Sequence, residues 1–213
     1  MKISWYGQAM TLIETLEGLR IVSDPYGEGT GYKVPGLRAD MVSVSHDHFD
    51  HNAVETLKGS PVLINKEGDR EISGVSFRGV SSFHDTEKGA ARGLNLIFRI
   101  KADNITIVHM GDIGHVIDSD TASLLRPCDI LILPVGGIYT VDGDGAFAIV
   151  EKLRPSIIIP VHYNTPKNIL GLGAADNFIE KFMDVRSGDE LVVDRKSLPK
   201  MPVVYQLNPL GER

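Results

Sequence analysis

The chain has little cysteine, no long apolar run and no excess of positive charge. A single cysteine among 213 residues, Cys128, excludes a disulfide framework and a cysteine-rich zinc ribbon. No apolar run approaches the roughly 18 residues that span a bilayer, and the N-terminus lacks the charged-then-apolar pattern of a signal peptide. We therefore expect a cytoplasmic protein with no membrane partner.

The charge balance is acidic, with 28 Asp and Glu against 22 Lys and Arg and a formal net charge of -6. Nucleic-acid-binding domains carry a basic face instead, so we expect no nucleic-acid partner. The hydrophobic fraction of 42% and the charged fraction of 23% are ordinary for a globular protein. The length, without a repeat or a Pro/Ser-rich linker, predicts one domain over residues 1–213, and a homo-oligomer stays open.

Short apolar runs bounded by Gly, Pro and Asp predict a strand-rich first half. The expected strands are residues 2–6, 10–15, 19–23, 40–45, 61–65 and 74–83, with one helix at 49–58. Residues 94–101 alternate with period two, and a turn then leads to residues 105–108, which predicts a hairpin.

The second half changes to alternating strands and helices. We expect strands at 129–134, 156–161 and 201–207, and helices at 119–125, from Asp144 to 153, and at 174–183. Ser119 and Asp144 are the predicted N-caps of the first two helices. This order indicates sheets covered by helices, in an α/β or an α+β sandwich, and periodicity does not decide between the two.

The seven histidines are concentrated where strands are expected to end. The segment from 46 to 51 reads His-Asp-His-Phe-Asp-His. Residues i and i+2 of an extended segment point to one side, so His46 and His48 can bind one cation, while Asp50 and His51 can reach a second. Imidazole and carboxylate suit zinc, iron or manganese. A solvated polar loop is the alternative, but chance places three histidines this way in fewer than about one chain in a hundred.

The motif HDHFDH resembles the HxHxDH motif of the metallo-β-lactamase superfamily. The resemblance covers nearly the whole chain and implies an α+β fold, a four-layer αββα sandwich. It implies that His46, His48 and His84 hold one metal ion, that Asp50, His51 and His162 hold another, and that Asp112 bridges them. Asp24, after an early strand, would orient a ligand histidine through its other ring nitrogen. The segments RGLN, HMGDIGH, LPVGGIYTVD and IIIPVHYNT resemble small prokaryotic hydrolases distantly related to L-ascorbate-6-phosphate lactonase.

Several further residues have two interpretations each. His109 is a packed histidine or a ligand, and His115 lines the site or is structural. Arg92, Tyr139 and Lys167 bind an anionic group of a substrate or are surface residues. Relatives often carry a histidine where this chain has Gln8, which keeps hydrogen-bonding ability but cannot titrate.

The resemblance implies a binuclear metal-dependent hydrolase. Two divalent ions, zinc first with manganese, iron or nickel as alternatives, would share a bridging hydroxide, with Asp50 and Asp112 as catalytic residues. The bond cleaved in a small, anionic substrate would be an ester, a lactone or a phosphodiester. The alternative is a non-catalytic metal-bound sensor or assembly module. Flavin–di-iron redox chemistry is disfavoured, because His48 stands where that branch has glutamate.

Overall fold

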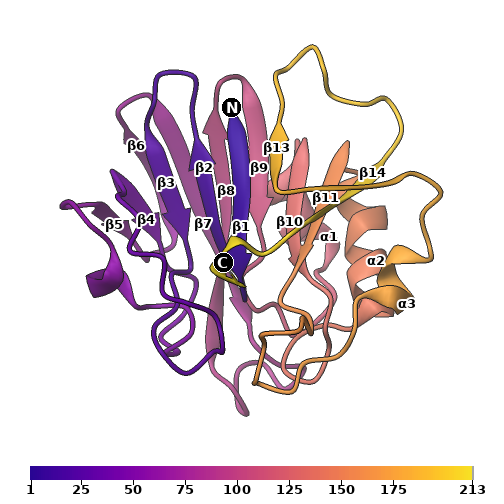
Figure 1. The fold of residues 1–213 in the computed structure, drawn as a ribbon. Coiled ribbons are helices and arrows are strands. Elements are labelled where there is room, and N and C mark those ends of the chain that lie inside the picture. Colours follow the sequence, from indigo (N-terminus) through magenta and orange to yellow (C-terminus); the bar gives the residue numbers. More distant parts are fainter. Residues whose placement is uncertain (213) are drawn as a thin grey trace.

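Two β-sheets packed face to face dominate the structure, a computed structural model that describes residues 1–212 (Figure 1). The first sheet contains β1 (Lys2–Gly7), β2 (Met10–Glu14), β3 (Arg20–Ser23), β4 (Met41–Ser43), β5 (Val62–Ile64) and β13 (Glu190–Val192). The second contains β6 (Gly68–Ile72), β7 (Val75–Phe83), β8 (Leu94–Ala102), β9 (Ile105–His109), β10 (Ile130–Pro134), β11 (Ile157–Val161), β12 (Val185–Gly188) and β14 (Val203–Leu207). The strand orders are β13-β1-β2-β3-β4-β5 and β12-β14-β11-β10-β9-β8-β7-β6.

The helices flank the sheets. They are α1 (Ser119–Leu125), α2 (Gly143–Leu153) and α3 (Asp176–Ile179), which lie together beside the larger sheet (Figure 1), and the 3-10 turns η1 (Val54–Thr56) and η2 (Leu210–Glu212). This arrangement confirms the predicted α+β sandwich, and it also confirms the hairpin, since β8 and β9 pair antiparallel. Among the described residues, no helix is both long and apolar enough to cross a bilayer.

At β2, β3 and β4 both faces of the smaller sheet are buried, which explains the continuous apolar runs of these strands. Ile21 and Met41 belong to the core between the sheets. Their neighbours Val22 and Val42 belong to a second cluster on the opposite face, which η1 and the loop containing Tyr26 cover. Because successive residues of a strand point to opposite faces of the sheet, each pair of adjacent residues contributes one side chain to each cluster.

The strand directions bring the carboxyl ends of several strands, after which the candidate ligands lie, to one edge of the sandwich. Strands β3 and β4 are parallel, as are β9, β10 and β11, and β7 runs in the same direction as β9 because each is antiparallel to β8. Within each sheet the carboxyl ends of these strands therefore share an edge, and the contacts of Asp112 after β9 with His51 after β4 and His84 after β7 bring the two edges together. The β1–β2 turn lies at this edge too, since β1 and β3 are both antiparallel to β2.

The predicted helix at residues 49–58 is wrong, and only the one-turn η1 forms within it. The backbone N–H of Ala53 donates to Pro25 O, and the N–H of Lys58 donates to Leu37 O. Hydrogen bonds to another segment thus replace the i→i−4 bonds of a helix. The predicted helix at 174–183 is likewise reduced to α3, after which Lys181 and Phe182 make i→i−3 bonds.

The helix caps also differ from the prediction. Asp118 caps α1 by accepting the N–H of Thr121, and Asp142 caps α2 by accepting the N–H of Gly145. Both carboxylates lie three residues before their donors, the spacing that an N-cap requires, whereas Ser119 and Asp144 are already inside the helices.

Strands β6, β12 and β13 were not predicted. Each lies at the edge of a sheet, and β6 reads Gly-Asp-Arg-Glu-Ile with an exposed surface. Edge strands of this kind are charged, because charge prevents pairing with another chain, and they lose the apolar alternation that sequence reasoning uses.

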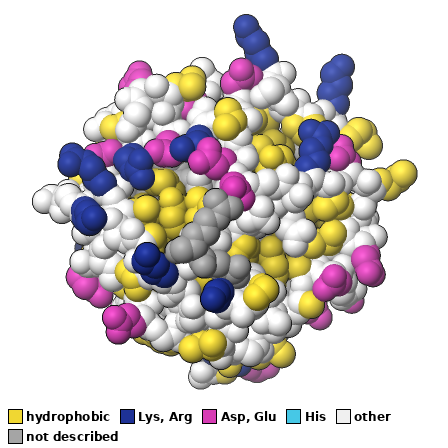
Figure 2. Space-filling view, viewed as in Figure 1, with side chains coloured by type: hydrophobic (Ala, Val, Ile, Leu, Met, Phe, Trp, Pro, Cys, Tyr) yellow, Lys and Arg dark blue, Asp and Glu magenta, His cyan; other side chains and the backbone are white. Residues whose placement is uncertain are grey.

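On the face in Figure 2, charged side chains of both signs are interspersed with apolar ones, and no histidine is seen.

Candidate metal centre

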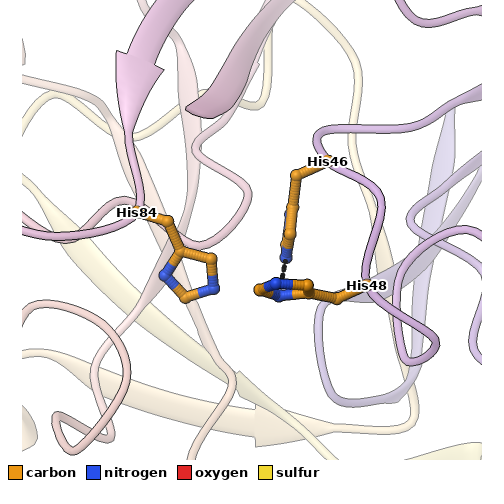
Figure 3. A group of neighbouring side chains, drawn as sticks. All are labelled: His46, His48 and His84. Atoms are coloured by element: carbon orange, nitrogen blue, oxygen red, sulfur yellow. Dashed lines mark hydrogen bonds between the residues drawn. The ribbon is translucent and has the colours of Figure 1, made fainter. Parts of the chain in front are cut away.

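Three histidines converge from two segments at the shared edge. His46 and His48 follow β4 on one loop, and His84 faces them from the end of β7 (Figure 3). The Nε2 of His46 lies 3.0 Å from the Nδ1 of His48, and the ring centroids of His46 and His84 are 4.7 Å apart. Each ring offers a nitrogen within 4.8 Å of the other two. One cation can therefore be reached by all three.

Asp112 joins this group to a second one. Its Oδ2 lies 3.2 Å from His51 Nε2, 3.3 Å from His84 Nε2 and 3.1 Å from His162 Nε2. Two further sets of potential ligands overlap there: His46, His51 and Asp112, and Asp50, His51 and His162. The structure thus brings together all seven residues predicted as ligands, from the loops after β4, β7, β9 and β11.

Asp24 lies behind His51 and is fully buried. Its Oδ1 accepts the N–H of Ser45 at 2.7 Å, and its Oδ2 accepts the Ser45 hydroxyl at 2.7 Å and His51 Nδ1 at 3.2 Å. The carboxylate therefore holds the ring of His51 with Nε2 turned toward Asp112. Ser45, which sequence reasoning missed, links Asp24 to the loop that carries His46.

Three residues of this site have left-handed backbone. The φ angles are 48° at Gln8, 47° at Asp24 and 50° at His162. Such conformations are uncommon outside glycine and cluster at functional sites, where the surrounding structure enforces them. At Gln8 the enforcement is visible, because its carbonyl accepts both the Trp5 indole N–H at 2.8 Å and the His162 N–H at 3.0 Å.

Asn95 positions the Asp112 loop. This buried side chain accepts the N–H of Asp112 at 2.9 Å and donates to Met110 O at 2.9 Å. A Cβ at Gly111 would lie 2.4 Å from Asn95 Oδ1, so only glycine lets the two segments approach this closely. Asn95 was not predicted as a site residue, although the RGLN segment that contains it was singled out.

At His46, His48 and Asp112 the electrostatics favour the protonation states that metal ligands need. Burial, together with the charge of His51, lowers the pKa of His46 to about 3, and burial also lowers the pKa of His48, so both rings are neutral near pH 7. Burial opposes ionisation of Asp112, but His162 and His51 outweigh it and hold its pKa well below the usual range. Neutral imidazole and ionised carboxylate are the forms that bind metal.

The donor atoms also fit a divalent ion. His51 is the exception: burial disfavours its charged form, yet the surrounding carboxylates, Asp112 first, raise its pKa well above its usual value, so a divalent ion would bind there in exchange for a proton. Buried polar atoms without a hydrogen-bond partner among the described residues include His51 Nε2, His84 Nδ1, Asp112 Oδ1 and His162 Nδ1. Unpaired buried polar atoms are costly, and His51 Nε2 faces the Asp112 carboxylate, so a cation bound between these two side chains would pair with both.

The remaining candidates are divided between the site and its surroundings. His109 makes backbone hydrogen bonds through both ring nitrogens, to Ala9 O and from the N–H of Gly111, and belongs to none of the potential ligand groups. His115 packs beside Phe83 and does not line the cavity that opens on the cluster. Tyr139 and Arg92 do line that cavity, and Lys167 does not.

Known proteins have similar sequences and the same fold. The pattern of the beta-lactamase superfamily domain matches residues 2–162. A UPF0173 metal-dependent hydrolase from Thermoplasma volcanium is 30% identical over 190 residues, covering 78% of this chain and 84% of the relative. This chain belongs to the UPF0173 metal-dependent hydrolase family. The relative from Archaeoglobus fulgidus is 28% identical over 196 residues, with 78% of this chain and 84% of the relative covered.

Solved structures agree with the family. A metallo-beta-lactamase superfamily protein from Thermotoga maritima, provisionally named a Zn-dependent hydrolase, is 31% identical with a TM-score of 0.82, covering 97% of this chain and 99% of its own. An isothiocyanate hydrolase from Delia radicum gut bacteria is only 13% identical, with a TM-score of 0.65 and coverage of 91% and 99%, and shows the fold alone. The likeness to L-ascorbate-6-phosphate lactonase stays a prediction.

In this UPF0173 protein, Gln8 contacts Asp50 directly. The buried Gln8 Nε2 donates to Asp50 Oδ2 at 2.8 Å, and its Oε1 accepts the Asn168 amide at 2.5 Å. The two bonds orient the amide, because only its nitrogen donates and only its oxygen accepts. Gln8 thus holds one carboxylate oxygen of a potential metal ligand in place.

The isosteric change Gln8→Glu replaces this donor by a second carboxylate. We expect kcat/KM and zinc affinity to fall by about 10- to 100-fold, since like charges in contact disfavour ionisation of both groups. Steady-state kinetics and a zinc competition titration measure the effect. Gln206→Glu, on β14 and outside the cavity lining, is the matched control. Unchanged zinc affinity in Gln8→Glu would show that the contact does not hold Asp50.

Proposed function

We propose that this UPF0173 protein is a binuclear hydrolase that cleaves an ester, lactone or phosphodiester bond in a small substrate. The observation that supports it is the convergence of overlapping ligand groups in one buried cluster that lines a cavity. One ion would be held by His46, His48 and His84, the other by Asp50, His51 and His162, with Asp112 contributing to both. Zinc is the first expectation, and manganese, iron or nickel suit the same donors.

The metal ions, when bound, supply Lewis-acid polarisation of the substrate and activate water as a nucleophile near neutral pH. The protein's own residues arrange this chemistry. Asp24 and Ser45 orient His51, and Gln8 holds Asp50 through Oδ2. Burial opposes ionisation of Asp50, but His51 outweighs it and lowers its pKa below the usual range, so its carboxylate is ionised, the form that binds a divalent ion.

Elemental analysis of the purified protein tests the metal centre. We expect about two divalent ions per chain, because two ligand groups with separate outer histidines are present. Less than about a tenth of an ion per chain after supplementation with zinc, manganese and iron would contradict the proposal. About one ion per chain would contradict its binuclear part.

A substrate panel tests catalysis. Lactones, thioesters, phosphodiesters and acyl amides are offered to the metal-loaded protein, and we expect turnover of at least one class that disappears in Asp112→Ala. Turnover that survives Asp112→Ala would assign the activity to a contaminant or another site. No turnover across the panel with two ions bound would favour a metal-bound sensor over an enzyme.

A further inference from the structure

The cavity beside the metal centre has two unlike walls. Its volume is about 380 Å³. The inner wall consists of potential metal ligands: His48, Asp50, His84, Asp112 and His162. The outer wall consists of Phe49, Ala91, Tyr139, Leu170 and Arg92. Among the described residues that line it, Arg92 is therefore the one permanent cation, and it is set in an otherwise mainly apolar wall.

Arg92 is held over the cavity by two contacts. Its guanidinium carbon lies 5.3 Å from the centroid of the Tyr139 ring, and its Nη2 donates to Ile138 O at 3.3 Å. Among the side chains that the structure describes, those of residues 1–211, no carboxylate forms an ion pair with it. A guanidinium has five N–H donors in a fixed fork, so most of them are left for a ligand.

The backbone that carries Arg92 is organised around Asp85. This buried carboxylate accepts four backbone N–H groups, from Glu87, Gly89, Ala91 and Arg92, at 2.7, 2.8, 3.0 and 2.7 Å. Burial opposes ionisation, but these hydrogen bonds outweigh it and lower the pKa of Asp85. The loop thus folds around the Asp85 carboxylate, and these hydrogen bonds position Ala91 and Arg92 at the cavity wall.

We infer that the substrate carries an anionic group, a carboxylate or phosphate, apart from the bond cleaved and joined to it by apolar atoms. Arg92 binds this anion through the fork geometry that matches such groups. Phe49, Tyr139 and Leu170 contact the apolar part, as is usual in small-molecule sites. The inference rests on the proposed hydrolase function and adds the substrate class and the residue that selects it.

Two esters that differ only in one charge test the selection. Mono-(4-nitrophenyl) succinate is anionic, and methyl 4-nitrophenyl succinate is its neutral counterpart. We expect the wild type to prefer the anionic ester by about 10- to 100-fold in kcat/KM, mainly through KM, the size of a charge-assisted bidentate contact. Arg92→Ala should abolish the preference and change the neutral ester by less than about threefold, while Arg92→Lys should keep part of the preference.

Arg70→Ala is the matched control, because Arg70 is an exposed arginine that donates to Leu63 O and does not line the cavity. A preference retained in Arg92→Ala, or lost equally in Arg70→Ala, overturns the inference. Asp85→Ala tests positioning: the anionic preference should fall although Arg92 is present, with metal content and neutral-ester kcat retained. An unchanged preference would show that Asp85 does not position Arg92.

Equilibrium binding separates failure of the inference from failure of the proposed function. Calorimetric titration of the zinc-loaded protein with phenylacetate, phenyl phosphate and neutral phenylacetamide requires no turnover. We expect at least one of the two anions to bind about 10- to 100-fold more weakly to Arg92→Ala than to the wild type. The anion that is affected shows whether the site takes a carboxylate or a phosphate. The binding of phenylacetamide should be unaffected. Equal Kd values in both proteins overturn the inference. Arg92-dependent binding without turnover of either succinate ester or of any member of the substrate panel supports the anion site and contradicts the hydrolase.

Discussion

Asp112→Asn is expected to lower kcat/KM by about 1,000-fold or more. The Oδ2 atom of Asp112 contacts three histidines from three different loops, His51, His84 and His162, so it connects the segments that carry the candidate ligands. Asparagine keeps the shape but loses the charge that, in the proposed binuclear site, would serve both metal ions. The loss should therefore exceed the about 10- to 100-fold typical of residues that only support metal ligands.

Kinetics on a substrate from the panel, together with elemental analysis, measure this change. Bound metal should fall from about two ions per chain to about one or fewer. Asp47→Asn is the matched control, since Asp47 belongs to the same motif but is exposed and accepts a hydrogen bond from Asn52. Asp112→Asn with full metal content and activity within about tenfold of wild type would refute the bridging role.

Asp24→Ala is expected to reduce the free energy of unfolding by about 3–5 kcal/mol, the size of breaking a buried ion pair. Three donors lose their acceptor at once: the N–H and hydroxyl of Ser45, and His51 Nδ1. The left-handed φ of 47° adds strain for alanine. Urea unfolding with a chelator present measures the effect without a contribution from metal release.

Asp24→Asn is the conservative comparison. Asparagine tolerates left-handed backbone and keeps one acceptor oxygen, so we expect about half the loss of stability and about 10- to 100-fold weaker zinc binding. If Asp24→Ala does not fold, the zinc affinity of Asp24→Asn carries the test alone. Stability within about 1 kcal/mol of wild type in Asp24→Ala, or unchanged zinc affinity in Asp24→Asn, would contradict this role.

Elements with local signals were predictable. The hairpin of β8 and β9 follows from period two around a turn, and helix α1 was predicted at its observed bounds. The region of residues 49–58 was mispredicted because its N–H groups donate to Pro25 and Leu37, partners that no local pattern reveals. Edge strand β6 was missed because its pairing with β7, not its polar sequence, makes it a strand.

The sequence by itself determined which imidazole and carboxylate groups this protein offers as candidate metal ligands. Seven residues with imidazole or carboxylate groups occur at strand ends in the order of the superfamily, and two of them, His46 and His48, have the spacing that puts both on one side of an extended segment. Such signals depend on residue type and short-range geometry, which the chain carries without knowledge of its fold.

Only the tertiary structure decided how the ligands are supported and what the cavity presents to a substrate. Gln8 contacts Asp50, which is 42 residues away in the sequence, and Asn168, which is 160 residues away. Arg92 lies over the ring of Tyr139 and belongs to a loop that folds around Asp85. These contacts depend on which strand ends share an edge and how each loop closes there. A hydrogen bond requires atoms about 3 Å apart, a condition that sheet packing sets and local sequence does not encode.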